Sequence, residues 1–414
     1  MSSGRLGGVS EARKLSRRSF LSGTALAAAA MSARIEAAGA AAPAPLAPLP
    51  PPLGKDVFRA RQRGLREAMK REGLDALFVT PSTNLQYCAN LTIGRSERLT
   101  ALILPATGPA ALVTPFFEVP RSEGSGVFEE MHSWQESEDP IALCARLMGT
   151  SHRIGIEGST AFETAEALGR AAKAELRDGS PLFSALRRVK TPQEQDLIRA
   201  AAARTLAAIE GTWKRLRPGM TELDGERILE EEFTRLGTPS GGLVQFGPSS
   251  ALPHGGPGER RLRRGDVVLI DTGCNVHGYN SDVTRMASLG KPSDRVRRVY
   301  ETVDRAQRAG ISALKAGASG QQVDAAARKV IDGAGFGKFF THRLGHGLGM
   351  DGHEAPYLVS GNAVALVPGN VETVEPGIYL PGEFGVRIED DYAVTESTAR
   401  GLSERPQEMK ILET

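Results

Sequence analysis

The chain is poor in the features that build disulfide-bonded or membrane-spanning proteins. It has only three cysteines in 414 residues, namely Cys88, Cys144 and Cys274, and no Cys-x-x-Cys pair. At most one intrachain disulfide can form, which excludes a disulfide-built scaffold and argues against a thiolate zinc site. No run of about 20 apolar residues occurs, so no stable membrane insertion is expected. With 40% hydrophobic residues, the chain has material for two or three globular domains.

A strong charge of either sign is also missing. The net charge is +2 at pH 7. Residues 1–40 contain six basic and two acidic side chains, a balance of +4, and subtracting it from +2 leaves −2 for the rest. Nucleic acid is therefore not expected as a partner.

The basic N-terminus has the pattern of a targeting signal. Residues 16–21 read SRRSFL, a twin-arginine pattern, and a mildly apolar run and small residues near Ala37–Ala41 follow. We interpret residues 1–40 as a twin-arginine signal peptide, which places the protein in the periplasm or outside the cell. Residues 41–54 are rich in proline and alanine, which predicts a stiff, extended linker.

Residues 55–184 are predicted to form an α/β domain. Helices are expected at Val57–Glu72 and Ala161–Leu176. Short apolar segments predict strands at Asp75–Thr80, Leu99–Leu104, Ala110–Thr114 and Arg153–Glu157. No group of potential ligands stands out here, so a structural or dimer-forming role at the border of the cleft is expected.

Residues 185–414 are predicted to form an α+β domain. Thr191, Pro192 and Glu194 have the spacing of a capping box and predict a helix that runs to about Leu216. Three further helices are expected at 221–237, 295–315 and 321–331, and strands at 267–275, 282–288, 371–374 and 386–394.

The stretch from Thr341 to Tyr357 concentrates residues that build sites. It reads THRLGHGLGMDGHEAPY and holds His342, His346 and His353 among four glycines. Histidine is the commonest metal ligand, and glycine allows close backbone approach. A glycine loop with solvent-facing histidines is the alternative, so the surrounding acidic residues decide the interpretation.

Four carboxylates are predicted to converge near this loop. A hairpin through residues 271–282 brings Asp271 beside Asp282, while Glu375 ends a strand and Glu389 lies on another, with Arg387 pointing the same way. Buried carboxylates repel one another, and two divalent cations would balance their four negative charges. With His346 added, this oxygen-rich set favours Mn²⁺, Co²⁺, Fe²⁺ or Zn²⁺. Taken singly, each acid could instead be a helix cap or a solvated strand end.

The order of these segments resembles the pita-bread metallopeptidases, the superfamily of Xaa-Pro aminopeptidases, prolidases, methionine aminopeptidases and creatinase. The resemblance covers about residues 55–405. Its motifs are Pro253-His254-Gly255, Asp271-x-Gly273, Tyr279-x-x-Asp282-x-x-Arg285, His342-x-x-x-His346-Gly347, Glu375-Pro376-Gly377-Ile378-Tyr379 and Gly385-Val386-Arg387-Ile388-Glu389-Asp390. Residues 73–87 are similar to the creatinase and prolidase N-terminal domain, which simple methionine aminopeptidases lack.

The resemblance implies a fold and a set of site residues. The fold is α+β, a pita-bread catalytic domain preceded by an α/β creatinase-type domain. The implied metal ligands are Asp271, Asp282, His346, Glu375 and Glu389. The implied catalytic residues are His254, His353, Glu375 and Arg387, and the implied substrate contacts are His254, His342 and His353.

The resemblance also implies a reaction. The expected enzyme is a homodimer that uses two divalent metal ions, Mn²⁺ first and Co²⁺, Zn²⁺ or Fe²⁺ as alternatives, to hydrolyse the Xaa-Pro bond of peptides by a metal-bridged hydroxide. Asp282 and Glu389 would bridge the ions, and Glu375 would accept the proton. His353 would stabilise the oxyanion or the leaving nitrogen, and His254 would orient the substrate.

Three alternatives stay open at this point. A creatinase-like amidinohydrolase or a metal-dependent lyase could use the same fold, although the complete ligand set argues against the first. A catalytically inactive binding module is the third. The sequence does not separate a dipeptidase from an aminopeptidase, a choice that depends on whether loops such as Leu91–Arg98 block the cleft.

Overall fold

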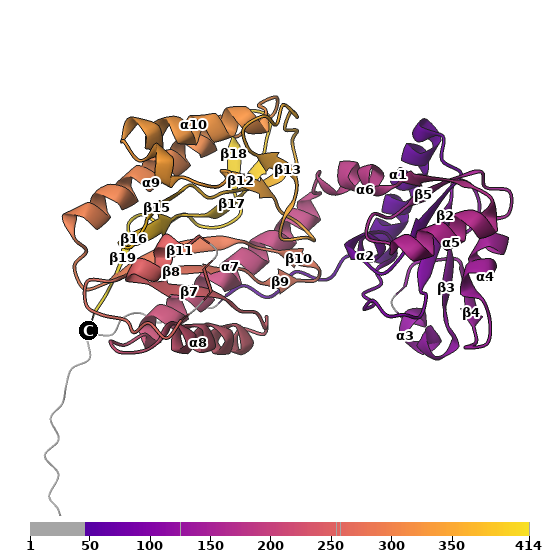
Figure 1. The fold of residues 1–414 in the computed structure, drawn as a ribbon, viewed down its shortest axis with the longest axis horizontal. Helices are drawn as coiled ribbons and strands as arrows, with labels where there is room; N and C mark the ends of the chain where they lie inside the picture. The colour runs from indigo at the N-terminus through magenta and orange to yellow at the C-terminus, as the bar shows by residue number, and fades with distance from the viewer. Residues whose placement is uncertain (1–45, 125, 254, 257, 414) are drawn as a thin grey trace, which may run out of the picture. The chain divides into compact units, whose positions relative to one another are not determined.

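The computed structural model describes residues 46–124, 126–253, 255, 256 and 258–413 (Figure 1). The proposed signal peptide, the first residues of the linker and His254 lie outside these described residues. Among the described helices, none is long and apolar enough to cross a membrane. All three cysteines are buried and free, so the one disulfide that their number allows is not formed.

The first part of the chain is a three-layer α/β structure around a six-stranded mixed sheet. The strand order is β4-β3-β2-β1-β5-β6. The strands are β1 Ala76–Val79, β2 Ala101–Pro105, β3 Ala111–Pro115, β4 Glu130–Trp134, β5 Arg153–Ile156 and β6 Glu175–Asp178. The helices are α1 Lys55–Glu72, α2 Thr83–Ala89, α3 Val119–Glu123, α4 Pro140–Met148, α5 Phe162–Ala172 and α6 Ser180–Arg187, with a short 3₁₀ helix η1 at Phe116–Glu118.

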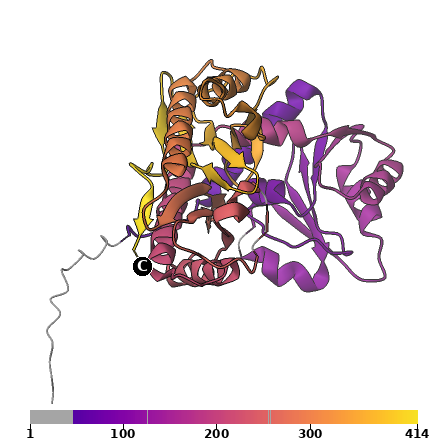
Figure 2. The same ribbon diagram turned by 60° about the vertical axis from the view of Figure 1, so that its left-hand side comes forward.

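The period-2 alternation of the strands builds two cores, one on each face of this sheet. Leu77 and Val79 of β1 pack with α1, α2 and α6, whereas Phe78 packs with α4 and α5 on the opposite face (Figures 1 and 2). The predicted helix at 161–176 was too long, because Lys173 adopts a left-handed backbone conformation that ends α5. Leu176 then lies in β6, where it packs against the core.

The second part contains two successive units, each a helix pair followed by a sheet. The second sheet is antiparallel, and the first is antiparallel except where β19 pairs parallel with β11. The helices are α7 Pro192–Arg215 and α8 Glu222–Arg235, then α9 Asp294–Ala313 and α10 Gly320–Gly333. Three of them begin with a capping box, including the predicted box of Thr191 and Glu194, which satisfies N–H groups of the first turn. The short 3₁₀ helices are η2 Gly247–Ala251 and η3 Gly337–Phe339.

The two sheets face each other between the helix pairs. The first has the order β19-β11-β8-β7, with α8 on β7 and α7 beside β11 (Figure 1). Its strands are β7 Gly242–Phe246, β8 Val267–Thr272, β11 Val283–Leu289 and β19 Lys410–Leu412. The second has the order β13-β12-β14-β17-β18, with strands β12 Gly345–Gly347, β13 Glu354–Leu358, β14 Val371–Val374, β17 Asp390–Val394 and β18 Ala399–Gly401. Two separate hairpins complete this part of the chain, β9 Asn275–Val276 with β10 Tyr279–Asn280 and β15 Gly377–Leu380 with β16 Phe384–Arg387.

The predicted strand at 386–394 is in fact two strands of different sheets. β16 pairs with β15 and ends at Arg387, and β17 pairs with β14 and begins at Asp390. Glu389 lies in the gap, where its N–H donates to the Thr284 carbonyl at 3.3 Å. The change of partner strand breaks the ladder and turns Glu389 toward the first sheet. The predicted strand at 267–275 likewise stops at Thr272.

The described end of the proline-rich segment contacts the second part of the chain. Arg204 of α7 donates to the Ala47 carbonyl at 3.0 Å, and His277 lies 3.2 Å from the Pro50 carbonyl. Leu53 packs against the core of the first helix-and-sheet unit. Residues 46–54 have no regular secondary structure, so these contacts are what hold the segment against the second part of the chain.

Candidate metal centre

Acidic side chains from both sheets meet in one cavity of about 440 Å³. Every predicted metal ligand lines it, and so do the predicted catalytic and substrate residues His342, His353 and Arg387. The described lining consists of Pro253, Asp271, Asp282, His342, Arg343, His346, His353, Glu375, Arg387 and Glu389. The site therefore lies between the two helix-and-sheet units rather than within either one.

Strand register brings the two aspartates together. Asp271 pairs with Thr284 across β8 and β11, and Asp282 immediately precedes β11. The Asp282 backbone N–H donates to an Asp391 carboxylate oxygen at 3.2 Å. Oxygen atoms of Asp271, Asp282 and Glu389 all lie within 4.8 Å of one another. The hairpin inferred from the sequence thus presents its two acids to a third from the other sheet.

A second set of potential ligands shares Glu389 with the first. It combines His346, Glu375 and Glu389, again with ligand atoms within 4.8 Å. His346 Nε2 lies 3.4 Å from Glu375 and 3.7 Å from Asp282. Because Glu389 belongs to both sets, the geometry can hold two cations with one carboxylate between them.

Two glycines let His346 reach this position. A Cβ on Gly345 would lie 2.0 Å from the Thr373 carbonyl oxygen, and one on Gly347 would lie 2.6 Å from the Glu354 carbonyl oxygen. Only glycine therefore allows β12 to lie so close to its neighbouring strands. His346 itself is almost fully buried, and its N–H donates to Thr373 Oγ1 at 3.1 Å.

The hydrogen bonds of His346 leave the lone pair of its Nε2 pointing toward the carboxylates. Its Nδ1 lies 3.1 Å from the Gly347 carbonyl, which can only accept, so Nδ1 carries the proton. Burial, followed by the neighbouring His353, lowers the pKa of His346 to about 3. The imidazole is thus neutral, and its Nε2 lone pair faces carboxylates, an arrangement that a bound cation would stabilise.

Burial and mutual repulsion raise the pKa of Asp282, Glu375 and Glu389 and so favour their protonated forms when no cation is bound. Burial raises the pKa of Glu389 to about 8, with further repulsion from Asp271. The pKa values of Asp282 and Glu375 are raised well above their usual range, first by burial and then by Glu389. Divalent metal ions would relieve this repulsion among the carboxylates. The donor set of several carboxylate oxygens and one imidazole also suits such ions.

Arg387 is a buried cation that contacts this acidic group directly. Its guanidinium contacts Asp271 Oδ2 and donates to Thr284 Oγ1 at 3.0 Å and Tyr379 Oη at 2.8 Å. Thr284 in turn donates to Glu389 Oε2 at 2.7 Å. Arg387 therefore holds Asp271 directly and Glu389 through Thr284.

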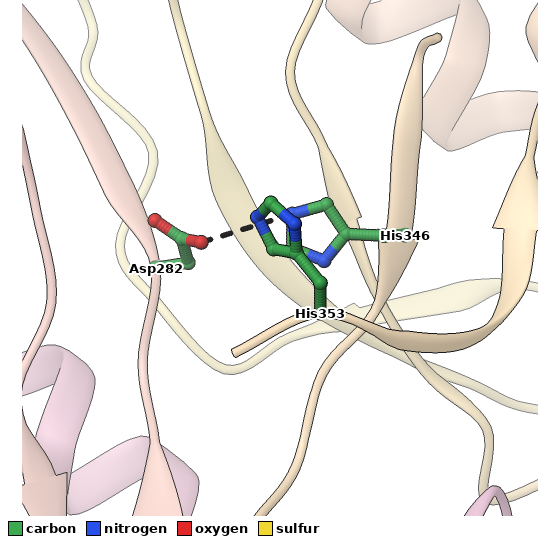
Figure 3. A group of neighbouring side chains, drawn as sticks. All are labelled: Asp282, His346 and His353. Carbon is green, nitrogen blue, oxygen red and sulfur yellow. Dashed lines mark ion pairs between the residues drawn. The ribbon is translucent and has the colours of Figure 1, made fainter. Parts of the chain in front are cut away.

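His342 and His353 take different positions in the cavity. His342 Nε2 lies 2.8 Å from Tyr379 Oη, and its Nδ1 lies 2.7 Å from the Arg343 carbonyl. The exposed ring of His353 lies against His346, with ring centroids 3.9 Å apart, and both histidines face Asp282 (Figure 3). A third possible ligand set joins Asp282, His346 and His353, so position alone fits His353 both as a ligand and as a substrate contact.

Three residues that contact the site residues were not predicted from the sequence. Thr284 could have been found, because it follows Asp282 at the period-2 spacing of a strand. Tyr379 lies within a quoted motif but carries no charge to draw attention. Arg343 adjoins His342, and its guanidinium lies 4.4 Å from the Tyr357 ring centroid and 3.2 Å from His353 Nδ1.

Known proteins of the same architecture identify the family. Residues 196–396 match the model of metallopeptidase family M24, and residues 61–189 match the creatinase/prolidase N-terminal domain. The chain belongs to metallopeptidase family M24. It is accordingly a peptidase of the pita-bread fold preceded by a creatinase-type domain, and the family implies divalent metal ions.

Several similar proteins are named as dipeptidases. A probable dipeptidase PepE of Mycobacterium tuberculosis is 37% identical over 376 residues, which cover 86% of this chain and 97% of the relative. The crystal structure of dipeptidase PepE from Mycobacterium ulcerans has a TM-score of 0.81 at 34% identity, covering 88% of this chain and all of that one. An Xaa-Pro dipeptidase from Bacillus anthracis has a TM-score of 0.79 at 34% identity, with coverages of 86% and 100%. The inactive-module alternative loses its support.

Proposed function

We propose that this peptidase hydrolyses dipeptides with proline in the second position and uses a pair of divalent metal ions. The observation that carries the proposal is the convergence of four carboxylates and one neutral imidazole in a single cavity, with Glu389 common to two sets. Asp271 and Asp282 would hold one ion, and His346 and Glu375 the other. Mn²⁺ is the preferred ion for so oxygen-rich a set.

The metal pair, when bound, would supply an activated water and polarise the scissile carbonyl. The residues of the chain do the rest. Glu375 has a pKa raised by burial and lies at the cavity, so it can accept a proton from the water and pass it on. Arg387 keeps Asp271 and, through Thr284, Glu389 in place.

His353 has the hydrogen-bonding state of a donor. Arg343 can only donate, so the 3.2 Å contact makes His353 Nδ1 the acceptor. In the neutral ring the proton then lies on Nε2, which can donate to the developing oxyanion or the leaving nitrogen. This hydrogen bond supports a role of His353 toward the substrate rather than as a metal ligand. The orienting role of His254 stays a prediction.

Arg343 provides a reason to favour dipeptides. Within the described part of the chain, it is the lining cation that makes no ion pair with an acid, whereas Arg387 is paired with Asp271. A dipeptide brings a free carboxylate close to its scissile bond, and a guanidinium stacked on Tyr357 can bind that group. In a longer peptide an amide would stand there instead. The dipeptidase names of the relatives agree with this choice.

A substrate panel tests the proposal. Metal-loaded enzyme is expected to cleave an Xaa-Pro dipeptide faster than its C-terminal amide or an Xaa-Pro tripeptide, and chelation should abolish the activity. Arg343→Gln should remove most of the preference by raising KM for the dipeptide alone, because a charge-assisted hydrogen bond of about 1.5–3 kcal/mol is lost. Equal rates for dipeptide and amide in the parent enzyme would overturn the dipeptide assignment and leave the metal centre standing.

We further propose export through the twin-arginine signal. The support is the sequence alone, since residues 1–45 lie outside the described structure. Replacing both Arg17 and Arg18 by lysine should trap the precursor in the cytoplasm, because the receptor reads the paired guanidinium groups. Unchanged delivery of this double variant to the periplasm would show that the motif is accidental.

The homodimer also stays a proposal. It follows from the family resemblance and the absence of a recognisable site in the N-terminal part. Light scattering coupled to size-exclusion chromatography should give twice the 44.1 kDa of the full chain, less any signal peptide removed. A mass of one chain across micromolar concentrations would exclude it.

A further inference from the structure

The loop that carries His353 is held by acids on both sides of it. Asp351 precedes His353 by two residues, and Glu354 follows it directly. Neither carboxylate belongs to a group of possible metal ligands among the described residues. Both instead bind the guanidinium of Arg187, which ends α6, with Nη2 at 2.5 Å from each. The N-terminal part of the chain thus supplies a cation that grips this loop at two points.

A second buried cation completes the grip. Lys190 Nζ lies 2.5 Å from Glu354 Oε1, so each Glu354 oxygen has its own partner. The Arg187, Lys190 and Glu354 side chains are only 9%, 2% and 10% exposed. Ion pairs this deeply buried hold a fixed geometry, and removing one partner leaves an uncompensated charge.

Neutral groups of the N-terminal part extend the network. Thr83 Oγ1 donates to Asp351 Oδ1 at 2.5 Å, and Arg187 Nη1 donates to Asn84 Oδ1 at 2.9 Å. Asn84 donates in turn to Glu157 at 3.0 Å. Arg187 therefore joins α2, the strand end at Glu157 and the histidine loop through one planar group.

The backbone around the two cations is also fixed. The Lys190 N–H donates to the Gly369 carbonyl at 2.8 Å, two residues before β14, the strand that leads to Glu375. A Cβ on Gly349 would lie 2.8 Å from Lys190 Cε and 2.7 Å from Glu354 Oε1. The loop is thus packed directly against the ion pair, and a shift of the pair would move the loop.

We propose that Arg187 and Lys190 are positioning residues that hold His353 at the cavity, acting through Asp351 and Glu354. The proposal rests on the role of His353 in the proposed function. It assigns a catalytic task to the junction of α6 and α7, which contributes no residue to the described lining of the cavity. The N-terminal part then sets turnover without touching the reacting atoms.

The test is a double-mutant cycle on metal-loaded full-length enzyme with an Xaa-Pro dipeptide. Arg187→Gln should lower kcat on the order of 10–100-fold, the scale of a displaced catalytic group, with little change in KM and with normal metal content. In the His353→Ala background the same change should cost nothing further, because the group it positions is gone. A general structural defect would multiply the two losses.

A second variant and a control keep the outcome decisive. Asp351 is 42% exposed, so Asp351→Asn tests the same contact without a buried charge and should lower kcat several-fold only when His353 is present. Arg215→Gln is the matched control, since Arg215 also binds two acids, Glu231 and Glu232, on helices that do not line the cavity. It should leave kcat unchanged.

Two results separate the possible failures. If His353→Ala turns over at the parental rate, the role proposed for His353 is wrong and takes this inference with it. If His353→Ala is slow but Arg187→Gln and Asp351→Asn keep the parental kcat, or if their losses multiply with that of His353→Ala, the positioning role alone is overturned.

Discussion

The core of the N-terminal part and the metal site of the catalytic part arrange their buried polar groups in opposite ways. Gln62, 1% exposed, donates to the carbonyls of Cys88 and Val127 at 2.9 and 2.8 Å, and Glu157 accepts from Asn84 and Ser159. These groups are satisfied within the fold. In the catalytic part Asp282, Glu375 and Glu389 instead face one another, and their pKa values are raised.

This contrast indicates what each part is built for. A satisfied polar group stabilises the chain that contains it, whereas a cluster of like charges lowers stability until a ligand balances it. The buried polar groups of the first part therefore stabilise its own fold, and Arg187 also binds the loop that carries His353. The second part keeps a repulsion among its acids that two cations would relieve. Its buried lining guanidinium, Arg387, is paired with Asp271 and does not neutralise the whole cluster.

The largest effect should come from removing the imidazole of the cluster. His346→Ala is expected to lower metal content and activity together, beyond the roughly 10²–10³-fold that follows the loss of one transition-state donor. Metal analysis and dipeptide cleavage on the purified variant check this. His132→Ala, which changes a histidine of the N-terminal part, is the control and should change neither. Normal metal content in His346→Ala would remove it from the ligand set.

His353→Ala should have a smaller and different effect. Turnover is expected to fall about 10²–10³-fold with near-normal metal content, because a donor to the reacting atoms is lost and no ligand. The same two measurements on this variant decide between the roles. A loss of metal as severe as that of His346→Ala would make His353 a ligand.

The next effect is on stability against pH. In metal-free protein the folded pKa values of Asp282, Glu375 and Glu389 exceed those of the unfolded chain. Their contribution to stability is therefore fully present below about pH 4 and is lost as pH rises, for Glu389 up to its folded pKa of about 8. The Tm of metal-free protein should therefore fall from pH 5 to 8. The increase in Tm on adding Mn²⁺ should become larger over the same pH range.

A matched comparison isolates the cluster in this experiment. Burial also raises the pKa of Glu372, which lies outside the described lining, so its contribution has the same sign with and without metal. Subtracting the Tm of the metal-free protein from that of the metal-loaded protein at each pH therefore cancels the contribution of Glu372. A difference that stays constant across this pH range would mean that the cluster is not what the cations relieve.

The smallest effect on activity is expected from the satisfied groups. Gln62→Leu leaves two carbonyls of the N-terminal part without their donor and should lower the free energy of unfolding by about 1–3 kcal/mol. The kcat and metal content of the folded enzyme should not change. Urea unfolding and turnover on one preparation test this, and a parallel loss of metal would break the contrast between the two parts.

Much of this arrangement could be read from the sequence because the signals are local. The Thr191 capping box lies within four residues, and the alternation of β1 and the Asp271–Asp282 hairpin each lie within a dozen. The gap at Glu389 could not be predicted, because it arises where β16 and β17 pair with different strands.

Long-range contacts also hid part of the site. The grip of Arg187 on Asp351 and Glu354 joins residues more than 160 positions apart. Arg343 adjoins His342, yet its stacking on Tyr357 depends on how β13 returns beside β12. Neither contact has a spacing that a sequence pattern could show.

Counting the metal ions tests the central claim most directly. Purified enzyme loaded with Mn²⁺ and freed of excess ion should retain about two ions per chain by elemental analysis, because four carboxylates and one neutral imidazole leave two divalent charges to balance. Activity on an Xaa-Pro dipeptide should rise with that occupancy and vanish on chelation. Full activity in a preparation verified to be metal-free would contradict the account.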